Sequence, residues 1–461
     1  MESNESQLPP ANDHYERTSL VFESILAGHL VHWQPRWSPN VRLVTDPGSP
    51  WFPITFGWLG PSTSTRVTHA TSQLTADKVR TQELLDAAGV PTPRSEVFPP
   101  DGYADARRFA TEIGWPVVVK PVGGGQGRGV SAGIGSDAGL DRAFSHINEA
   151  GYGTEPFLVQ QHVSGRCYRV LASRERVYGA YYKLPAHVVG DGISTVEKLV
   201  LFKNSQRQAN PHLGTSDRAI VLDGEARRLL SRQGIGAASV PSLGELVQLA
   251  IADNTHRGAD SIEVTGETNP DVASVVTRAI QAIPGLDYGG VDIILPRGHR
   301  EAASVDSCSV IEVNCGTGLG GHLYPMYGPP NNVCHEIVTD TATSAGLVPR
   351  RFDNTSVVAV AVRLMHDSRP SDAATALPDL APVATPTVIP RDGDTLAVLV
   401  GDSANIYAAI HNHLARTFGT IIAVRVKPKS TGHDGPTLEQ RLPPAPFLPL
   451  RHAEALAAAN R

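Results

Sequence analysis

Three side chains with oxygen atoms that could bind a metal stand on, or directly after, two short apolar runs of the sequence. The runs, Val291–Leu295 and Ser309–Val313, are separated by a polar turn, which predicts a β-hairpin. Because side chains alternate between the faces of a strand, Glu312 and Asn314 point the same way, and Asp292 can face them from the other strand. Two carboxylates and an amide suit Mg²⁺, which prefers oxygen ligands. The alternative is a solvated strand edge without a metal.

A glycine-rich segment, Gly123–Val130, reads GGGQGRGV and follows a buried apolar run that ends in Lys120. Glycines let the backbone adopt positive φ, and their N–H groups can surround phosphate oxygens. No Gly-Lys-Ser/Thr follows, so the segment is not a Walker A loop. It leads into VSAGIG, which favours a strand rather than the helix of a dinucleotide fingerprint. We therefore predict a phosphate-covering flap between two strands, with a merely mobile hairpin as the alternative.

Periodicity and turn residues outline the elements that would position these groups. Lys78 lies in the first turns of a predicted helix that ends at Gly89 and is followed by two prolines. The remaining predictions are helices over 103–113 and 268–283, a helix that begins at Ser194, strands over 116–119 and 158–163, and antiparallel strands over 166–184.

Composition restricts the class of protein. The chain has 461 residues with 41% hydrophobic content, so we expect two or three domains. A formal net charge of -6, with no block of Lys or Arg, argues against a nucleic-acid partner. The four cysteines lack zinc-site spacing and are typical of reduced buried thiols. We find no signal peptide and no membrane-spanning run, so we expect a cytoplasmic location without a membrane partner.

Six segments in order resemble the ATP-grasp carboxylate–amine ligases, most closely the ATP-grasp domain of cyanophycin synthetase. PAHVVGDG is particularly distinctive, because D-alanine ligases differ there, and NTHRGA also resembles the NLHRGG of ribosomal-protein glutamate ligases. The similarity covers residues 65–346. The segments are ADKVRTQELLDAAGVPTP, GWPVVVKPVGGGQGRGV, VQQHVSGRCYRVL, LPAHVVGDGISTVEKLV, NTHRGADSIEVT, and GLDYGGVDII with VIEVNCGTGLGGHLYP.

The resemblance implies a role for each matching residue. Those implied to hold the nucleotide are Lys78 and Lys120 on the α- and β-phosphates, a loop with Gly123, Gly124, Gly125, Gln126, Gly127 and Gly129, and an adenine hinge with Gln160, Gln161, His162 and Val163. Those implied to act in the reaction are Asp292, Glu312 and Asn314 as ligands of Mg²⁺, with two ions expected and Mn²⁺ as an alternative, and Arg169 and Lys183 near the γ-phosphate. Asn254 and Arg257 are expected on the phosphate and acceptor side.

Four positions depart from the family pattern. Gln160 replaces a usual Glu, and Cys167 replaces the acid that holds the ribose hydroxyls. Ala259 replaces a glycine, and Thr317 stands where proline is common. The departures affect ribose and acceptor binding more than phosphate binding. Nothing after Ala345 resembles the Mur-ligase-like half of cyanophycin synthetase, so a polymerising enzyme is not expected.

The expected fold class is α/β (α+β), an ATP-grasp fold with additions at both ends. A tail and small N-terminal α/β domain span 1–72, and the ATP-grasp domain spans 73–350, with a lid subdomain at about 115–165. A small C-terminal α/β domain with a Pro-rich tail spans 351–461, where strand, helix and strand are predicted over 395–426.

The expected activity is ATP-dependent joining of an amino-acid or peptide carboxylate to an amine through an acyl-phosphate, in peptide natural-product biosynthesis. The partners would be ATP, the acid and the amine, and a homo-oligomer is expected from the relatives. One alternative is a nucleotide-binding regulatory protein with a lapsed site. Another is a partner-binding role centred on the C-terminal domain.

Overall fold

The structure is a computed structural model that describes residues 67–344, except 125–127, 209, 211, 215–217 and 304–306, and the backbone of eight strands in the flanking segments. The chain divides into two compact units. One contains residues 66–315, 325–329 and 447–461, and the other contains residues 1–65, 316–324 and 330–446. Every candidate site residue named above lies in the first of these units, within 66–315.

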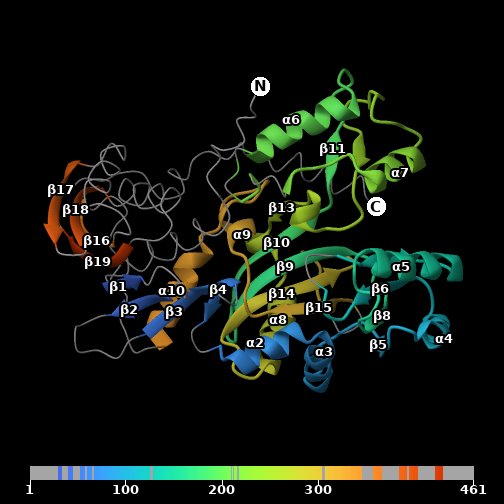
Figure 1. Cartoon of the computed structure of the whole chain (residues 1–461), viewed down its shortest axis with the longest axis horizontal. Helices are drawn as coiled ribbons and strands as arrows, with labels where there is room; N and C mark the ends of the chain where they lie inside the picture. Colours follow the sequence, from blue (N-terminus) through green and yellow to red (C-terminus); the bar gives the residue numbers. More distant parts are fainter. Residues whose placement is uncertain are drawn as a thin grey trace. The chain divides into compact units, whose positions relative to one another are not determined.

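The centre of this first unit is a five-stranded sheet with strand order β13-β10-β9-β14-β15 (Figure 1). Its neighbouring strands all run antiparallel. The strands are β9 (Arg166–Ser173), β10 (Val177–Leu184), β13 (Asp260–Glu263), β14 (Tyr288–Leu295) and β15 (Ser309–Asn314). The predicted hairpin over 291–313 is confirmed as β14 and β15, with a register shift after Asp292. The mixed helix and antiparallel sheet content confirms the expected fold class.

Helix α8 (Pro270–Ala282) packs against this sheet. Its buried positions are Val272, Val275, Val276, Ala279 and Ile280, at the spacing of one helical face. Asn269 caps the helix by accepting a hydrogen bond from the backbone N–H of Asp271, and Pro270 occupies the first turn, where no N–H is needed. The prediction of a helix over 268–283 is confirmed.

A second sheet, with order β5-β8-β6-β7, carries the glycine segment. Its strands and helices are β5 (Ser95–Phe98), α4 (Tyr103–Ile113), β6 (Val117–Pro121), β7 (Ser131–Ile134), α5 (Asp137–Glu149) and β8 (Phe157–Gln161). Helices α4 and α5 share an aromatic core with it, in which the rings of Tyr103 and Phe144 lie 4.4 Å apart. The predicted position of the glycine segment between two antiparallel strands is confirmed by β6 and β7.

Two helices, α2 (His69–Ala76) and α3 (Lys78–Ala87), stand where the sequence predicts one. The prediction was wrong about continuity because Asp77 interrupts the segment. The Asp77 carboxylate accepts hydrogen bonds from the backbone N–H groups of Val79 and Arg80, so it caps a new helix. Lys78 is therefore the first residue of α3.

An insert over 185–259 separates β10 from β13 and has a hydrophobic core of its own. Its elements are β11 (His187–Val189), α6 (Val196–Gln208), α7 (Gly224–Arg232), β12 (Leu246–Gln248) and the short 3₁₀ helix η3 (Thr255–Arg257). The core combines Val196 and Val200 of α6 with Ala226 and Leu230 of α7. A second 3₁₀ turn, η4 (Thr265–Glu267), follows β13.

The other unit contains an eight-stranded sheet of order β17-β18-β16-β19-β1-β2-β3-β4. These strands are β1 (Leu30–Trp33), β2 (Asn40–Val44), β3 (Phe52–Gly57), β4 (Gly60–Ser64), β16 (Val357–Met365), β17 (Ala384–Arg391), β18 (Asp394–Asp402) and β19 (Ile421–Pro428). Two helices, α9 (Gly320–Leu323) and α10 (Val333–Ser344), also belong to it. β1 pairs with β19, so strands from both ends of the chain share one sheet. The helix predicted between the last two strands lies outside the described residues.

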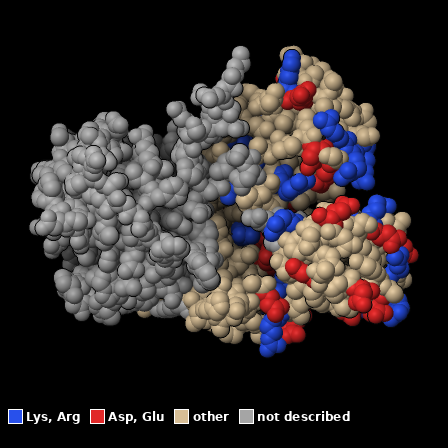
Figure 2. All heavy atoms as spheres, viewed as in Figure 1, with Lys and Arg blue, Asp and Glu red and all other residues tan. Residues whose placement is uncertain are grey.

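Charges of both signs are interspersed on the face of the described surface shown in Figure 2. Within the described part of the chain, no helix combines the length and apolarity that a membrane span requires.

Candidate active site

A row of polar side chains crosses the central sheet. Residues that pair directly across neighbouring strands point to the same face. Glu263 pairs with Tyr181, Tyr181 with Arg169, Arg169 with Asp292, and Asp292 with Glu312. The register of four antiparallel strand pairs therefore collects these groups on one face. Lys183, two residues after Tyr181 on β10, lies on the same face.

We call Glu263, Tyr181, Lys183, Arg169, Asp292 and Glu312 the Asp292 row. Within this row, Asp292 is held by two cations. Arg169 Nε lies 2.5 Å from Asp292 Oδ1 and Arg169 Nη2 lies 3.0 Å from Oδ2, a two-pronged ion pair. Lys183 Nζ lies 2.8 Å from Oδ2. Burial alone would raise the pKa of Asp292, but the two cations outweigh it and hold that pKa far below its usual range. The same carboxylate raises the pKa of Lys183 against the opposing effect of burial.

Glu312 and Asn314 complete the predicted ligand set for Mg²⁺. Glu312 pairs with Asp292, and Asn314 pairs with Gly290. The Nδ2 atom of Asn314 is buried and makes no hydrogen bond in the described part of the chain. Two carboxylates and an amide oxygen are the ligand types of a hard cation that takes its other ligands from water and phosphate, whereas the unpaired Nδ2 is a donor and would not bind the ion. Among the described residues, no group of three or more His, Cys, Asp or Glu is arranged to hold a metal ion, so Asn314 and ligands from outside the protein would have to complete the set.

Lys120 projects from β6 and donates a hydrogen bond to Gln160 Oε1 of β8 at a distance of 3.0 Å. Their neighbouring strands place them side by side. Burial, helped by repulsion from Lys78, lowers the pKa of Lys120 to about 8, although Glu312 opposes the shift. A neutral glutamine accepts the hydrogen bond but supplies no negative charge, so this partly buried ammonium has no compensating charge on β8.

Lys78 contacts the backbone of the glycine segment. Its Nζ lies 3.0 Å from the carbonyl oxygen of Val122 and 2.8 Å from that of Gly124. Gly129 has φ of +70°, which favours glycine, and a Cβ on Gly124 would collide with Pro121. Gly123, Gly124 and Gly129 thus belong to a segment that needs glycine, whereas Gly125, Gln126 and Gly127 lie outside the described residues.

A pocket brings several of the predicted nucleotide-binding residues together. It lies between α2, α3, the strands β6 and β8, and β15. Its lining consists of Thr75, Lys78, Thr81, Gln82, Leu85, Thr92, Lys120, Leu158, Gln160, Val310, Ile311, Glu312 and Val313. The two predicted phosphate-binding lysines and one predicted metal ligand therefore face the same pocket.

The predicted adenine hinge begins at the end of β8. Gln160 is buried and Gln161 is exposed. The backbone N–H groups of Gln161 and His162 donate to the carbonyl oxygens of Arg94 and Pro116, so both donors are used within the fold. Val163 follows β8, which ends two residues earlier than the predicted strand.

Asn254 and Arg257 lie on the turn before β13. The contacts of their side chains described here are with residues outside the Asp292 row. Asn254 Oδ1 accepts a hydrogen bond from the backbone N–H of His256 and caps η3. Arg257 Nη2 lies 3.1 Å from Asp223 Oδ2 and also pairs with Glu225. Those carboxylates raise the pKa of Arg257 and hold its side chain at the start of α7.

Sequence reasoning did not single out Asp253, which lies beside Cys167. Its carboxylate hydrogen-bonds the thiol of Cys167, whose pKa is raised mainly by burial. The neighbourhood of Cys167 therefore contains an acid, although it comes from the insert rather than from β9. Asp253 stands directly before the NTHRGADSIEVT segment, which begins at Asn254, so its position beside that segment was the signal available.

Comparison with known proteins finds similarity over part of the chain. Residues 77–168 match the carbamoyl-phosphate synthase L chain, ATP binding domain. Over 267 residues the chain is 31% identical to a cyanophycin synthetase of Geminocystis herdmanii, which covers 58% of this chain and 30% of that protein. A bifunctional glutathione biosynthesis protein of Desulfotalea psychrophila is 28% identical over 264 residues, with 57% and 33% covered.

Among solved structures, a bifunctional glutathione synthetase from Pasteurella multocida aligns with a TM-score of 0.48 at 24% identity, over 66% of this chain and 41% of that one. The chain spans about a third of the length of the curated relatives it matches. The sequence matches confirm the resemblance found in the motifs: this chain contains an ATP-grasp domain related to that of the cyanophycin synthetases.

Proposed function

We propose that the protein is an ATP-dependent carboxylate–amine ligase that forms an amide through an acyl-phosphate and releases ADP and phosphate. The observation that carries this proposal is the Asp292 row, in which Asp292 and Glu312 share one face of the sheet with the cations Arg169 and Lys183. A carboxylate is a poor electrophile, and transfer of a phosphoryl group makes it reactive towards an amine.

The residues divide the work by charge. Lys78 and Lys120 are proposed to bind the α- and β-phosphates, and Arg169 and Lys183 to stabilise negative charge on the transferred phosphoryl group and the acyl-phosphate. Asp292, Glu312 and Asn314 would hold Mg²⁺. The ion, when bound, supplies charge neutralisation between the phosphates. The glycine segment is proposed to keep water from the acyl-phosphate.

The finer assignments are also proposals. We propose two Mg²⁺ ions with Mn²⁺ as a substitute, a cytoplasmic location, and an amino-acid or peptide carboxylate as one substrate. Asp253 is proposed to meet the ribose hydroxyls in place of the acid that relatives carry at the position of Cys167. Asn254 and Arg257 are proposed for the acceptor side, where Arg257 would have to exchange Asp223 and Glu225 for substrate.

The test is ADP release with Mg²⁺ and ATP against a matrix of amino acids, offered singly and in pairs. We expect release with one pair and a product mass equal to their condensation. Glu312→Ala should lower that rate at least about 100-fold, because a ligand of the charge-neutralising ion is lost. Glu301→Ala, on the exposed turn of the same hairpin, is the control and should match the wild type.

The result that would overturn the proposal is ADP release by Glu312→Ala at the wild-type rate. ATP binding without release for any substrate pair, including peptides, would favour the nucleotide-binding regulatory protein instead.

A further inference from the structure

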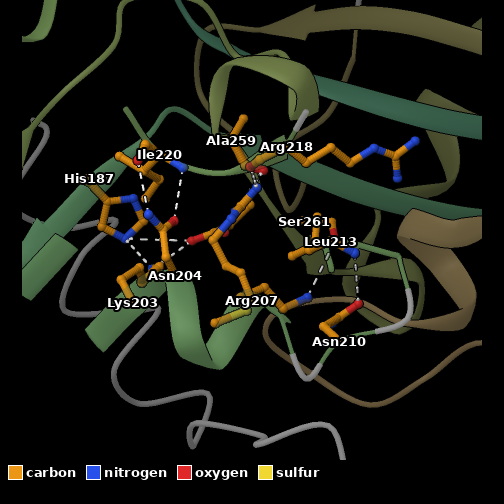
Figure 3. Close-up of polar contacts among 12 residues, drawn as sticks. His187, Lys203, Asn204, Arg207, Asn210, Leu213, Arg218, Ile220, Ala259 and Ser261 are labelled. Atoms are coloured by element: carbon orange, nitrogen blue, oxygen red, sulfur yellow. Dashed lines mark hydrogen bonds and ion pairs between the residues drawn. The ribbon is translucent and has the colours of Figure 1, made fainter. Parts of the chain in front are cut away.

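A buried polar cluster joins the insert to the edge of the central sheet (Figure 3). Lys203 and Arg207, one turn apart on α6, both pair with Asp260 at the start of β13. Lys203 Nζ lies 2.6 Å from Asp260 Oδ2, and Arg207 Nη1 contacts Oδ1. Their side chains are 8%, 1% and 0% exposed, so water screens none of these charges. We call Lys203, Arg207, Asp260, His187 and Tyr327 the Asp260 cluster.

Lys203 connects the cluster to two further segments. Its Nζ lies 2.6 Å from the hydroxyl oxygen of Tyr327 and 3.4 Å from His187 Nε2. An ammonium only donates, so Nε2 accepts, and His187 Nδ1–H donates to the carbonyl oxygen of Pro185, 2.8 Å away. Burial first, and the neighbouring Lys203 second, lower the pKa of His187 to about 4, so it is neutral at physiological pH.

Arg207 connects the cluster to the turn before β13. Its Nη1 lies 3.2 Å from the carbonyl oxygen of Ala259, and its Nη2 lies 2.8 Å from that of Arg218. Figure 3 shows the guanidinium extending from α6 towards Ala259. Arg207 therefore ties together α6, the loop at 218–220, and the turn 254–259.

The charges of the cluster do not balance. Two cations share one carboxylate while His187 is neutral, which leaves a formal surplus of one positive charge in a buried place. One cation would suffice to neutralise Asp260, and a second buried cation costs free energy unless its hydrogen bonds achieve something else. Each cation binds a different segment of the chain. Lys203 donates a hydrogen bond to the segment that contains Tyr327, and Arg207 donates one to the turn that contains Ala259.

The turn 254–259, which Arg207 contacts, is packed tightly and leads into β13, the strand that pairs with β10 of the Asp292 row. Gly258 has φ of +85°, and a Cβ there would lie 2.8 Å from Ile220 Cγ1, so the turn has little room to shift. One residue beyond Asp260, Ser261 pairs with Lys183, which contacts Asp292. A displacement of the turn would therefore pass along β13 to Lys183, whereas the pocket lined by Lys78 and Lys120 includes no residue of the turn or of β13.

We propose that Arg207 is a positioning residue for the amine acceptor: it fixes the turn 254–259 through Ala259 and Asp260, and thereby sets the affinity for the amine without touching it. The inference rests on the proposed function, which assigns this turn to the acceptor side. This positioning role explains why a second cation is buried here, whereas neutralisation of Asp260 requires only one.

The experiment compares Arg207→Met with Lys203→Met. Both changes remove one cation and leave Asp260 with the other, so their electrostatic effects are matched. Only Arg207→Met removes the hydrogen bond to Ala259. We expect Arg207→Met to raise the KM for the amine at least about tenfold while the KM for ATP stays within about twofold, and Lys203→Met to leave both KM values within about twofold.

A second readout needs no activity. The amide N–H groups of Gly258 and Ala259 donate to the carbonyl oxygens of Thr255 and Asn254, so hydrogen–deuterium exchange reports on the turn. Exchange at these amides should quicken in Arg207→Met and not in Lys203→Met. If Arg207→Met fails to fold, Arg207→Lys takes its place. Lysine keeps a positive charge beside Asp260, but its side chain is too short to reach the carbonyl oxygen of Ala259 in the same way.

The proposal is overturned if the two variants raise the KM for the amine equally, or if exchange of the turn is the same in the wild type and the Arg207 variant. If the wild type releases no ADP with any substrate pair, the proposed function fails. The exchange measurement then decides the positioning role by itself.

Discussion

Lys120 shows how one residue change alters a binding site. Gln160 accepts its hydrogen bond at 3.0 Å but has no charge, so burial dominates and the pKa of Lys120 falls to about 8. A carboxylate at position 160 would stabilise the ammonium and raise that pKa. The pocket thus contains a lysine, proposed to bind phosphate, that titrates close to physiological pH.

The affinity for ATP should consequently depend on pH. The charged form of Lys120 attracts phosphate, so affinity should fall as pH rises through about 8, and binding should take up a proton there. Gln160→Glu should move this fall to higher pH. Calorimetric titration of ATP in buffers of different ionisation enthalpy measures both quantities. An affinity and a proton uptake that stay constant across this range in the wild type would refute the role of Lys120.

For individual residues, the sequence predicted that Asp292 and Glu312 face each other, but it did not predict the ion pair between Asp292 and Arg169. Strand alternation sufficed to place Asp292 opposite Glu312, because the two lie on one hairpin. The ion pair of Asp292 with Arg169 joins residues 123 positions apart. Local patterns carry no information on such a register, which depends on how β9 and β14 dock.

Among the elements, β14 has the central role because it lies between β9 and β15 and carries Asp292. Asp292 neutralises two largely buried cations, so its contribution to stability differs from that of Glu312, whose side chain is only partly buried. Removing one partner of a buried ion pair leaves an uncompensated charge, which costs about 3–5 kcal/mol.

Asp292→Asn should accordingly lower the free energy of unfolding by about 3 kcal/mol or more, whereas Glu312→Gln should unfold near the wild type. Because the folded-state pKa of Asp292 is depressed, this stabilisation is present above the unfolded pKa of about 4 and is lost as pH falls through the lower folded value. Urea unfolding at neutral and acidic pH tests this. Equal midpoints for both variants at neutral pH would contradict it.

Element predictions succeeded where local signals are strong. Helix α4 occupies the predicted 103–113, and α8 begins at its predicted proline. The break at Asp77 was missed because apolar spacing continues across it, and only the hydrogen bonds of the Asp77 carboxylate show the second start. The core of the insert was missed because its members are spread over 65 residues, from Ala186 to Ala250.

For the whole molecule, the pairing of β1 with β19 is the main observation beyond the sequence. Val31 and Val424 face each other across this pair. A strand pairing between the two ends of a chain leaves no local pattern, so sequence reasoning treated the ends as separate small domains. The boundaries at 72 and 350 stay a prediction.

Removal of residues 354–461 should therefore damage more than the C-terminal region. It removes β16 to β19 and exposes the edge of β1, and unpaired apolar edges promote aggregation. We expect the shortened chain to aggregate in size-exclusion chromatography. A chain that ends at residue 428 keeps every strand of the sheet and serves as the control. A monodisperse chain after removal of 354–461, with unchanged melting, would rule this account out.

The insert over 185–259 leaves the sheet after Leu184 and returns at Asp260, and these two residues are cross-strand partners about 5 Å apart. Its entry and exit are therefore held together by the sheet, while Lys203 and Arg207 of the insert neutralise Asp260 at the exit. During evolution such a segment can lengthen, diverge or be exchanged while Lys183, Arg169 and Asp292 keep their places. New acceptor preferences could then arise in the insert, and the phosphate chemistry would be inherited unchanged.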